Sequence, residues 1–298
     1  MLLTCCVSSI ADLLVAKPGR DPKLALDDMP TYVKNELGLH GVNLTTDLLA
    51  GAGRQRIERL RERADKAGCA CLLLIEQEAL PFGAEDPDKA QAAGDRGRRV
   101  LQAASLLGCN AAAVSIDAPF ANNAATDEET TDRVVDHVRM VLERADKLEI
   151  NLLVSPRPGL TEDPQRVTDL LKKIGGFRVG TLPDFKSASE AEDPAAYMRR
   201  LTPYASVVLA TTYEFEEPSE DEQEAGDKPG SLEDLADMLM AAEPAKHSTY
   251  DLEPLLEAIG SVGFDGTLAI DYRGGGDGTL GSLQSRDAIE AALEALAE

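Results

Sequence analysis

The feature that most constrains this chain is a two-part unit that recurs along its whole length. Each unit begins with a short apolar run, which predicts a buried strand, and most continue through a polar loop into an amphipathic stretch with helical spacing. The apolar runs number eight and span residues 2–10, 41–44, 69–76, 111–117, 150–155, 179–182, 207–211 and 267–271. Strands that alternate with helices are typical of parallel sheets with right-handed crossovers.

The helical stretches between the strands complete the pattern. They span residues 55–67, 89–107, 130–148, 164–174, 251–262 and 285–297, and a further helix-like piece lies at 232–241. Eight units in 298 residues fit a (β/α)₈ TIM barrel, an α/β fold that needs about 250 residues. We therefore predict a single barrel domain over residues 1–298. An open, doubly wound sheet is the alternative, but no glycine-rich fingerprint follows the first strand.

One acidic segment interrupts the regular alternation. Residues 216–227 contain seven acidic side chains and no basic one, and they belong to a predicted insertion at about 216–246, after the seventh strand. A solvated loop explains such a run, and we prefer that interpretation. A lid over the functional face is the alternative.

Charge and cysteine content restrict the class of protein. The net charge of -23 repels nucleic-acid phosphates, so we expect no nucleic-acid partner. No apolar stretch approaches the ~20 residues of a membrane helix, and the start of the chain lacks the features of a signal peptide. The five cysteines are odd in number, form no Cys-x-x-Cys pair, and fall in or beside apolar runs, which predicts reduced core residues of a cytoplasmic protein. The sequence leaves the oligomeric state open.

Acidic residues lie at or just after the ends of four predicted strands. They are Glu76, Asp117, Asp184 and Asp271. In a barrel, residues at the carboxyl ends of the strands converge on one pocket. Any one of these acids alone is explained as a turn or cap residue. Together they suggest a site where carboxylates bind a hard divalent cation or move a proton between carbons, as in sugar isomerases and epimerases.

Four motifs make the sequence similar to a known family. Residues 180–185 (GTLPDF), preceded by Arg178 and Val179, resemble the sixth-strand motif of the sugar phosphate isomerase/epimerase family, the xylose isomerase-like TIM barrels. Residues 264–274 resemble the last strand of that family, 106–110 its fourth-strand entry, and 152–156 fall where its fifth strand is expected. The resemblance covers nearly the whole chain and implies a barrel that acts on a carbohydrate or sugar phosphate.

The same resemblance implies a metal site drawn from four strands. The family uses an acid on the fifth strand, an acid on the sixth, a His on the seventh and a Glu on the eighth, which bind Mn²⁺, Mg²⁺, Co²⁺ or Zn²⁺. The corresponding residues here are Ser155, Asp184, Leu209 and Asp271. Asp184 and Asp271 are thus the metal ligands and catalytic residues that the resemblance implies. Ser155 and Leu209 depart from the family pattern, so the metal site is expected to be degenerate.

Further polar residues on the same face are predicted to contact the substrate. Arg157 follows the fifth strand and Arg273 the eighth, where a run of glycines, 274–276, would let backbone amides approach an anion. An Arg adds a strong charged contact. A flexible turn with Arg273 paired to a nearby carboxylate, such as Asp277, explains the same residues. The predicted substrate-binding set is Arg157, Arg273, Glu76, Asp117, Ser155 and Thr211.

Two functions follow from these features. The first is a sugar or sugar phosphate isomerase or epimerase that transfers a proton with little or no help from a divalent metal. The second is a non-catalytic barrel that binds a sugar-like or anionic ligand, or a protein partner. The resemblance favours the first, and the departures at Ser155 and Leu209 favour the second. Metal-free chemistry that uses other carboxylates is a third hypothesis, for which the sequence defines no reaction.

Overall fold

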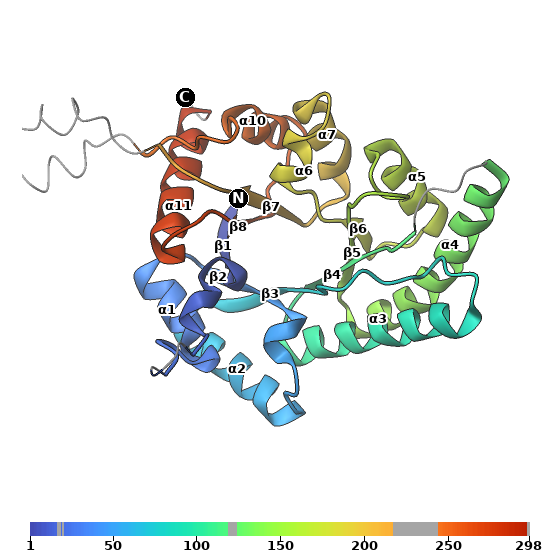
Figure 1. Cartoon of the computed structure of the whole chain (residues 1–298), viewed down its shortest axis with the longest axis horizontal. Coiled ribbons are helices and arrows are strands. Elements are labelled where there is room, and N and C mark those ends of the chain that lie inside the picture. The colour runs from blue at the N-terminus through green and yellow to red at the C-terminus, as the bar shows by residue number, and fades with distance from the viewer. Residues whose placement is uncertain (17–18, 20, 119–123, 217–243, 297–298) are drawn as a thin grey trace, which may run out of the picture.

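A curled sheet of eight parallel strands forms the centre of the molecule and is surrounded by helices (Figure 1). The computed structural model describes residues 1–16, 19, 21–118, 124–216 and 244–296. The strand order is β6-β5-β4-β3-β2-β1-β8-β7. The strands are β1 (Leu2–Cys6), β2 (Gly41–Thr45), β3 (Ala70–Ile75), β4 (Ala111–Ser115), β5 (Asn151–Ser155), β6 (Val179–Thr181), β7 (Val207–Thr212) and β8 (Thr267–Tyr272). The prediction of a single-domain (β/α)₈ barrel is confirmed.

The barrel closes between β6 and β7 through a narrow contact. The two strands share no extended ladder; they meet at an isolated parallel bridge between Asp184 and Leu209, where the Leu209 amide donates to the Pro183 carbonyl at 2.8 Å. Closure therefore joins a predicted site residue, Asp184, to the strand that carries Leu209.

The long helices lie at the predicted amphipathic stretches, although α4 and α11 begin earlier than residues 130 and 285, where the sequence predicted them to start. They are α2 (Arg54–Ala67), α3 (Pro87–Leu107), α4 (Ala124–Leu148), α5 (Pro164–Ile174), α10 (Glu253–Ser261) and α11 (Gly278–Ala295). Local chemistry sets their ends. The Asp163 side chain accepts a hydrogen bond from the Arg166 amide at the start of α5, and Pro164 occupies its first turn. Gly68 ends α2 and Gly108 ends α3, both in the left-handed conformation.

Some elements differ from the sequence-based expectation. The first apolar run, 2–10, is a strand only as far as Cys6, and a 3₁₀ helix, η1 (Val7–Leu13), follows. Because Val7 and Ile10 are fully buried in η1 as well, apolar character alone could not distinguish the two conformations. Three short helices were not predicted, because each has too few turns to show a period: α1 (Met29–Glu36), α6 (Phe185–Ser189) and α7 (Pro194–Leu201). The predicted piece at 232–241 lies outside the described residues.

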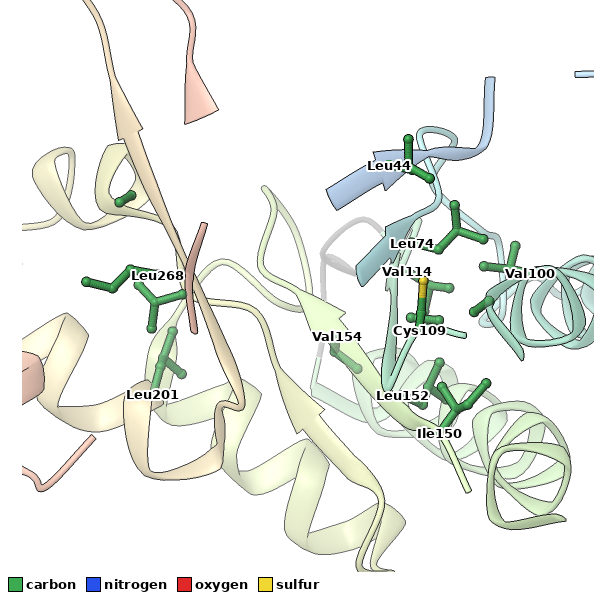
Figure 2. Close-up of a cluster of buried hydrophobic side chains, with 14 of the residues drawn as sticks. Leu44, Leu74, Val100, Cys109, Val114, Ile150, Leu152, Val154, Leu201 and Leu268 are labelled. Carbon is green, nitrogen blue, oxygen red and sulfur yellow. The ribbon is translucent and has the colours of Figure 1, made fainter. Parts of the chain in front are cut away.

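The core has two layers, one on each face of the curled sheet, and the residues of β4 alternate between them. Ala112 and Val114 face outward into the main cluster between the strands and the helices, whereas Ala111 and Ala113 face into the barrel. Figure 2 shows part of the outer layer, where Leu74, Val114 and Val100 lie close together between the strands and α3. The inner layer contains many small side chains, and it includes Leu209.

Two further expectations can be compared with the structure. All five cysteines are free and buried, as the apolar runs predicted. Among the helices of the described residues, none combines the length and the apolarity needed to span a bilayer.

Candidate functional site

A central cavity of about 650 Å³ opens at the carboxyl ends of the strands. This is the face where the barrel architecture predicts a functional site. Its walls come from the ends of β1, β2, β3, β4, β5, β7 and β8, from Asp184 after β6, and from the loops after β1, β3 and β8. The polar side chains among them are Ser8, Ser9, Asp12, Thr45, Glu76, Gln77, Ser115, Ser155, Asp184, Asp271, Tyr272 and Arg273.

An arginine joins the two predicted carboxylates. Nε and Nη2 of Arg273 lie 2.8 and 2.6 Å from Oδ2 of Asp271, and Nη2 lies 3.3 Å from Oδ2 of Asp184. Ser8 donates from Oγ to the other Asp271 oxygen at 2.9 Å. We call these four residues the Arg273 cluster. It brings Asp184 and Asp271 together, as the sequence predicted, but with a guanidinium between them.

Local structure fixes each member of the cluster. Asp271 lies within β8, and Arg273 follows this strand directly. Asp184 caps the first turn of α6, where its Oδ1 accepts from the Lys186 amide at 3.0 Å. Ser8 lies in η1, whose neighbour Ser9 accepts a hydrogen bond from the Tyr272 amide at 2.8 Å and so holds η1 against the end of β8.

Burial and charge oppose each other in this cluster. The side chains of Asp184 and Asp271 are only 13% and 7% exposed, whereas that of Arg273 is 39% exposed. Burial raises the pKa of Asp184, although the positive charge of Arg273 works in the opposite direction. Burial alone would lower the pKa of Arg273, but the charges of Asp271 and Asp184 outweigh it and raise that pKa. The guanidinium therefore stays charged between its two carboxylates.

One side of Arg273 is free to meet a ligand. Its Nε and Nη2 bind the carboxylates, whereas Nη1 has no hydrogen-bond partner among the residues that the structure describes. Because Arg273 lines the cavity, the two Nη1 hydrogens are donors available to an oxygen atom there.

Glu76 has a partner of its own at the edge of the cavity. Its side chain is 1% exposed, lies 2.6 Å from Nε of Arg96, and accepts from the Thr46 hydroxyl at 3.1 Å. It also lines a second pocket of about 590 Å³, beside α3. Glu76 is thus a cavity residue, but its charge is already balanced by Arg96.

The structure places two predicted site residues away from the central cavity. Asp117 is exposed and does not line it. Arg157 lines an outer pocket beside α5 and α7. Thr211 does not line the cavity either, but it lies beside it: it is fully buried within β7, is paired in register with Asp271, and its carbonyl accepts a hydrogen bond from the Tyr250 hydroxyl. Ser155 does line the central cavity, and Ser115 lies beside it in register on β4.

Several cavity residues were missed by sequence reasoning. Ser8, Ser9 and Asp12 lie in η1, which the sequence analysis assigned partly to the first strand. A pair of serines directly after Cys6 and Val7 was the available signal, because consecutive polar residues at the end of an apolar run mark the end of a buried strand.

The donor set does not fit the divalent metal that the family resemblance implies. Both carboxylates are already paired to Arg273. Leu209 offers no ligand atom and belongs to the apolar layer inside the barrel. Within the described parts of the chain, no group of three or more His, Cys, Asp or Glu side chains could hold a metal ion. The positive charge of Arg273 already compensates the negative charges of these two buried carboxylates.

Comparisons with known proteins agree with the geometry of the barrel. The sequence matches the family described as xylose isomerase-like TIM barrel over residues 33–298. None of the curated proteins matches it.

Solved structures resemble the fold at low sequence identity. D-psicose 3-epimerase from Clostridium cellulolyticum H10, solved with D-tagatose, is 14% identical with a TM-score of 0.70, and the match covers 99% of this chain and 97% of that one. L-ribulose 3-epimerase is 13% identical with a TM-score of 0.73, covering 99% and 95%. The IOLI protein, solved with a bound zinc atom, is 11% identical with a TM-score of 0.67, covering 99% and 98%.

At such identities the solved structures establish the fold, and the family match over most of the chain establishes the relationship. The chain belongs to the xylose isomerase-like TIM barrel family.

Proposed function

We propose that the central cavity binds a carbohydrate-like ligand, a small molecule with several hydroxyl groups, without a divalent metal. The observation that carries this proposal is the lining of the cavity: serines from η1, β4 and β5 line it together with Arg273, whose Nη1 has no partner among the described residues. Hydroxyls both donate and accept hydrogen bonds, and a guanidinium donates strongly to oxygen, so the set suits a polyol.

Solved structures with a similar fold support the same class of ligand. Two solved relatives are named as 3-epimerases of ketoses, and one was solved with D-tagatose. The cavity volume, about 650 Å³, is in the range of small-molecule sites. The predicted cytoplasmic location and the absence of nucleic-acid and membrane partners stay predictions from the sequence.

Calorimetric titration with a panel of ketoses, aldoses and sugar phosphates, in buffer containing EDTA, tests the proposal. We expect at least one sugar to bind with a Kd that EDTA does not change. Ser155→Leu should abolish this binding because it fills the cavity, whereas Ser261→Leu, on α10 and away from the cavity, should leave it intact. Lack of binding across the panel, or binding that EDTA removes, would contradict the proposal.

Proton transfer on the bound sugar is a second candidate function. It is favoured by the position of Asp271, a carboxylate that lines the cavity beside Arg273, which could polarise a carbonyl oxygen. Ser155 occupies the fifth-strand position and cannot act as a general base unaided, so the fifth strand supplies no second carboxylate to work with Asp271. One base suffices to move a proton between neighbouring carbons, whereas inversion at one carbon requires a proton donor on the opposite face.

Deuterium exchange separates turnover from binding alone. The protein is incubated with a bound sugar in D₂O, and proton NMR follows the carbon-bound hydrogens next to the carbonyl. Turnover predicts exchange that Asp271→Asn abolishes while binding of the sugar persists. Absence of exchange at saturating sugar would remove this second candidate and leave the binding function.

A further inference from the structure

The placement of Arg273 has a consequence beyond ligand binding. Its guanidinium lies between two buried carboxylates that come from separate strand ends, Asp184 after β6 and Asp271 in β8. In chemical terms this is the location that a cation shared by these two acids would take, since both acids direct an Oδ2 atom to the same Nη2 nitrogen.

The guanidinium has a strong advantage over a metal ion from solution. It is covalently tethered two residues from Asp271, so it competes at a high effective concentration. A dissolved divalent ion would have to displace it and would then meet the two carboxylates of the pair, while the adjacent Leu209 supplies no ligand atom. Two carboxylates and a serine hydroxyl are few ligands for ions that prefer about six oxygens.

We propose that Arg273 is a built-in cation that takes the place of a divalent metal in this barrel. The inference has two parts. First, Arg273 excludes metal from the Asp184–Asp271 pair, and this part is independent of which ligand the cavity binds. Second, the free Nη1 donates to a carbonyl or carboxylate oxygen of the ligand, and this part rests on the proposed carbohydrate-binding function.

Removal of the guanidinium tests the first part. Mn²⁺ is titrated into the protein, and electron paramagnetic resonance measures the free ion. We expect wild type to take up no Mn²⁺ at the pair, and Arg273→Met to bind one ion per chain with a Kd at least tenfold below the highest Mn²⁺ concentration at which wild type shows no uptake. Arg273→Lys, which keeps the positive charge, should remain close to wild type.

Two controls identify the location of the ion. In the double variant Arg273→Met with Asp184→Asn, the gained binding should disappear. Arg96→Met removes a matched arginine, which pairs with the single carboxylate of Glu76 beside the same cavity, and should gain no binding. Guanidinium ion at millimolar concentration should compete with Mn²⁺ in Arg273→Met, because it can refill the vacated position.

The outcomes that overturn the inference are distinct. Micromolar binding of one Mn²⁺ by wild type that Asp184→Asn removes would show that Arg273 does not exclude the metal. A folded Arg273→Met variant with no gain in Mn²⁺ binding would show the same pair to be no latent cation site. Should Arg273→Met fail to fold, Arg273→Gln, which also removes the positive charge but keeps a polar side chain, takes its place in the same titration with the same expected gain.

The second part is tested with sugars that differ at one oxygen. A ketose and the polyol obtained by reducing its carbonyl are titrated into wild type and Arg273→Lys in EDTA. Wild type should prefer the ketose at least tenfold, and Arg273→Lys should lose this preference. Equal affinities in wild type would overturn the second part, whereas failure of both sugars to bind would count against the proposed function and leave the metal experiment standing.

Discussion

At the scale of single residues, His247 shows how a side chain that does not line the cavity holds the end of a barrel strand. It is buried, its Nε2 accepts from the Tyr213 amide at 2.9 Å, and its Nδ1 lies 2.8 Å from the Tyr250 carbonyl. These two contacts require a neutral ring with its proton on Nδ1, because a protonated Nε2 could not accept. Tyr213 directly follows β7, so the histidine ties this strand to the segment before α10.

The histidine makes stability depend on pH. Burial lowers the pKa of His247 below its ordinary value near 6.5, so between the two values the unfolded chain binds more protons than the folded one. The stability that the neutral ring contributes is present above pH 6.5 and is lost as pH falls. Urea unfolding of wild type should show a loss on the order of 1 kcal/mol between pH 7.5 and 5.5, the value of one hydrogen bond.

Two variants check the source of this pH dependence. His247→Gln should flatten the profile in that range, whereas His40→Gln, at an exposed histidine, should retain it. An unchanged profile in His247→Gln would assign the effect to other groups.

The Arg273 cluster illustrates the limit of inference from residue type. Sequence reasoning identified Asp184, Asp271 and Arg273 separately, with Arg273 predicted to bind substrate or to pair with a nearby carboxylate such as Asp277. The structure pairs it with Asp271 and Asp184, while Asp277 caps α11. Asp184 is 89 residues from Arg273 along the chain, and a partner at that separation cannot be read from local patterns.

At the scale of secondary-structure elements, β6 depends on close backbone approach. A Cβ atom on Gly180 would lie 2.3 Å from the Tyr204 carbonyl oxygen and 3.2 Å from Leu153 Cδ2. Since the first neighbour is backbone in the turn before β7, it cannot move aside as a flexible side chain would. The short strand β6 can therefore pack here only with glycine at this position.

Paired glycine substitutions measure this constraint. Gly180→Ala should lower the free energy of unfolding by about 2–3 kcal/mol through overpacking. Gly260→Ala, within α10 and with no neighbour within 4 Å of the added Cβ, should raise it by about 0.5 kcal/mol through helix propensity. Urea denaturation of both variants provides the test, and a Gly180→Ala variant as stable as wild type would refute the packing argument.

At the scale of the whole molecule, net charge is the dominant surface property. Acidic residues outnumber basic ones by 53 to 30, and the resulting charge of -23 causes repulsion in the compact state. Dissolved salt screens exposed charges that are separated by more than the Debye length, which is about 10 Å at 0.1 M.

Salt should therefore stabilise the fold. Raising NaCl from 20 to about 300 mM is expected to raise Tm by a few degrees, which corresponds to a gain of ~1 kcal/mol in the free energy of unfolding. Little further gain is expected at higher salt, because the exposed charges are then already screened. Differential scanning calorimetry across a NaCl series measures this. A Tm that falls with salt would show that surface ion pairs outweigh the repulsion, and a linear rise without a plateau would indicate exclusion of the salt from the surface instead.

The sequence by itself determined the architecture, because strands and helices have different periods and eight alternating units leave few parallel arrangements. Residues 164–174 form the predicted helix without change, and Asp184 and Asp271 lie at one cavity as strand-end positions require. Only the tertiary structure decided the chemistry of that cavity. The path of the loops after β5 and β8 directs Arg157 outward and Arg273 between two carboxylates, and the turn after β1 adds Ser8 to them. Such placements depend on contacts between distant segments, which no local pattern encodes, and they join the two acids that the resemblance implied as metal ligands through an arginine.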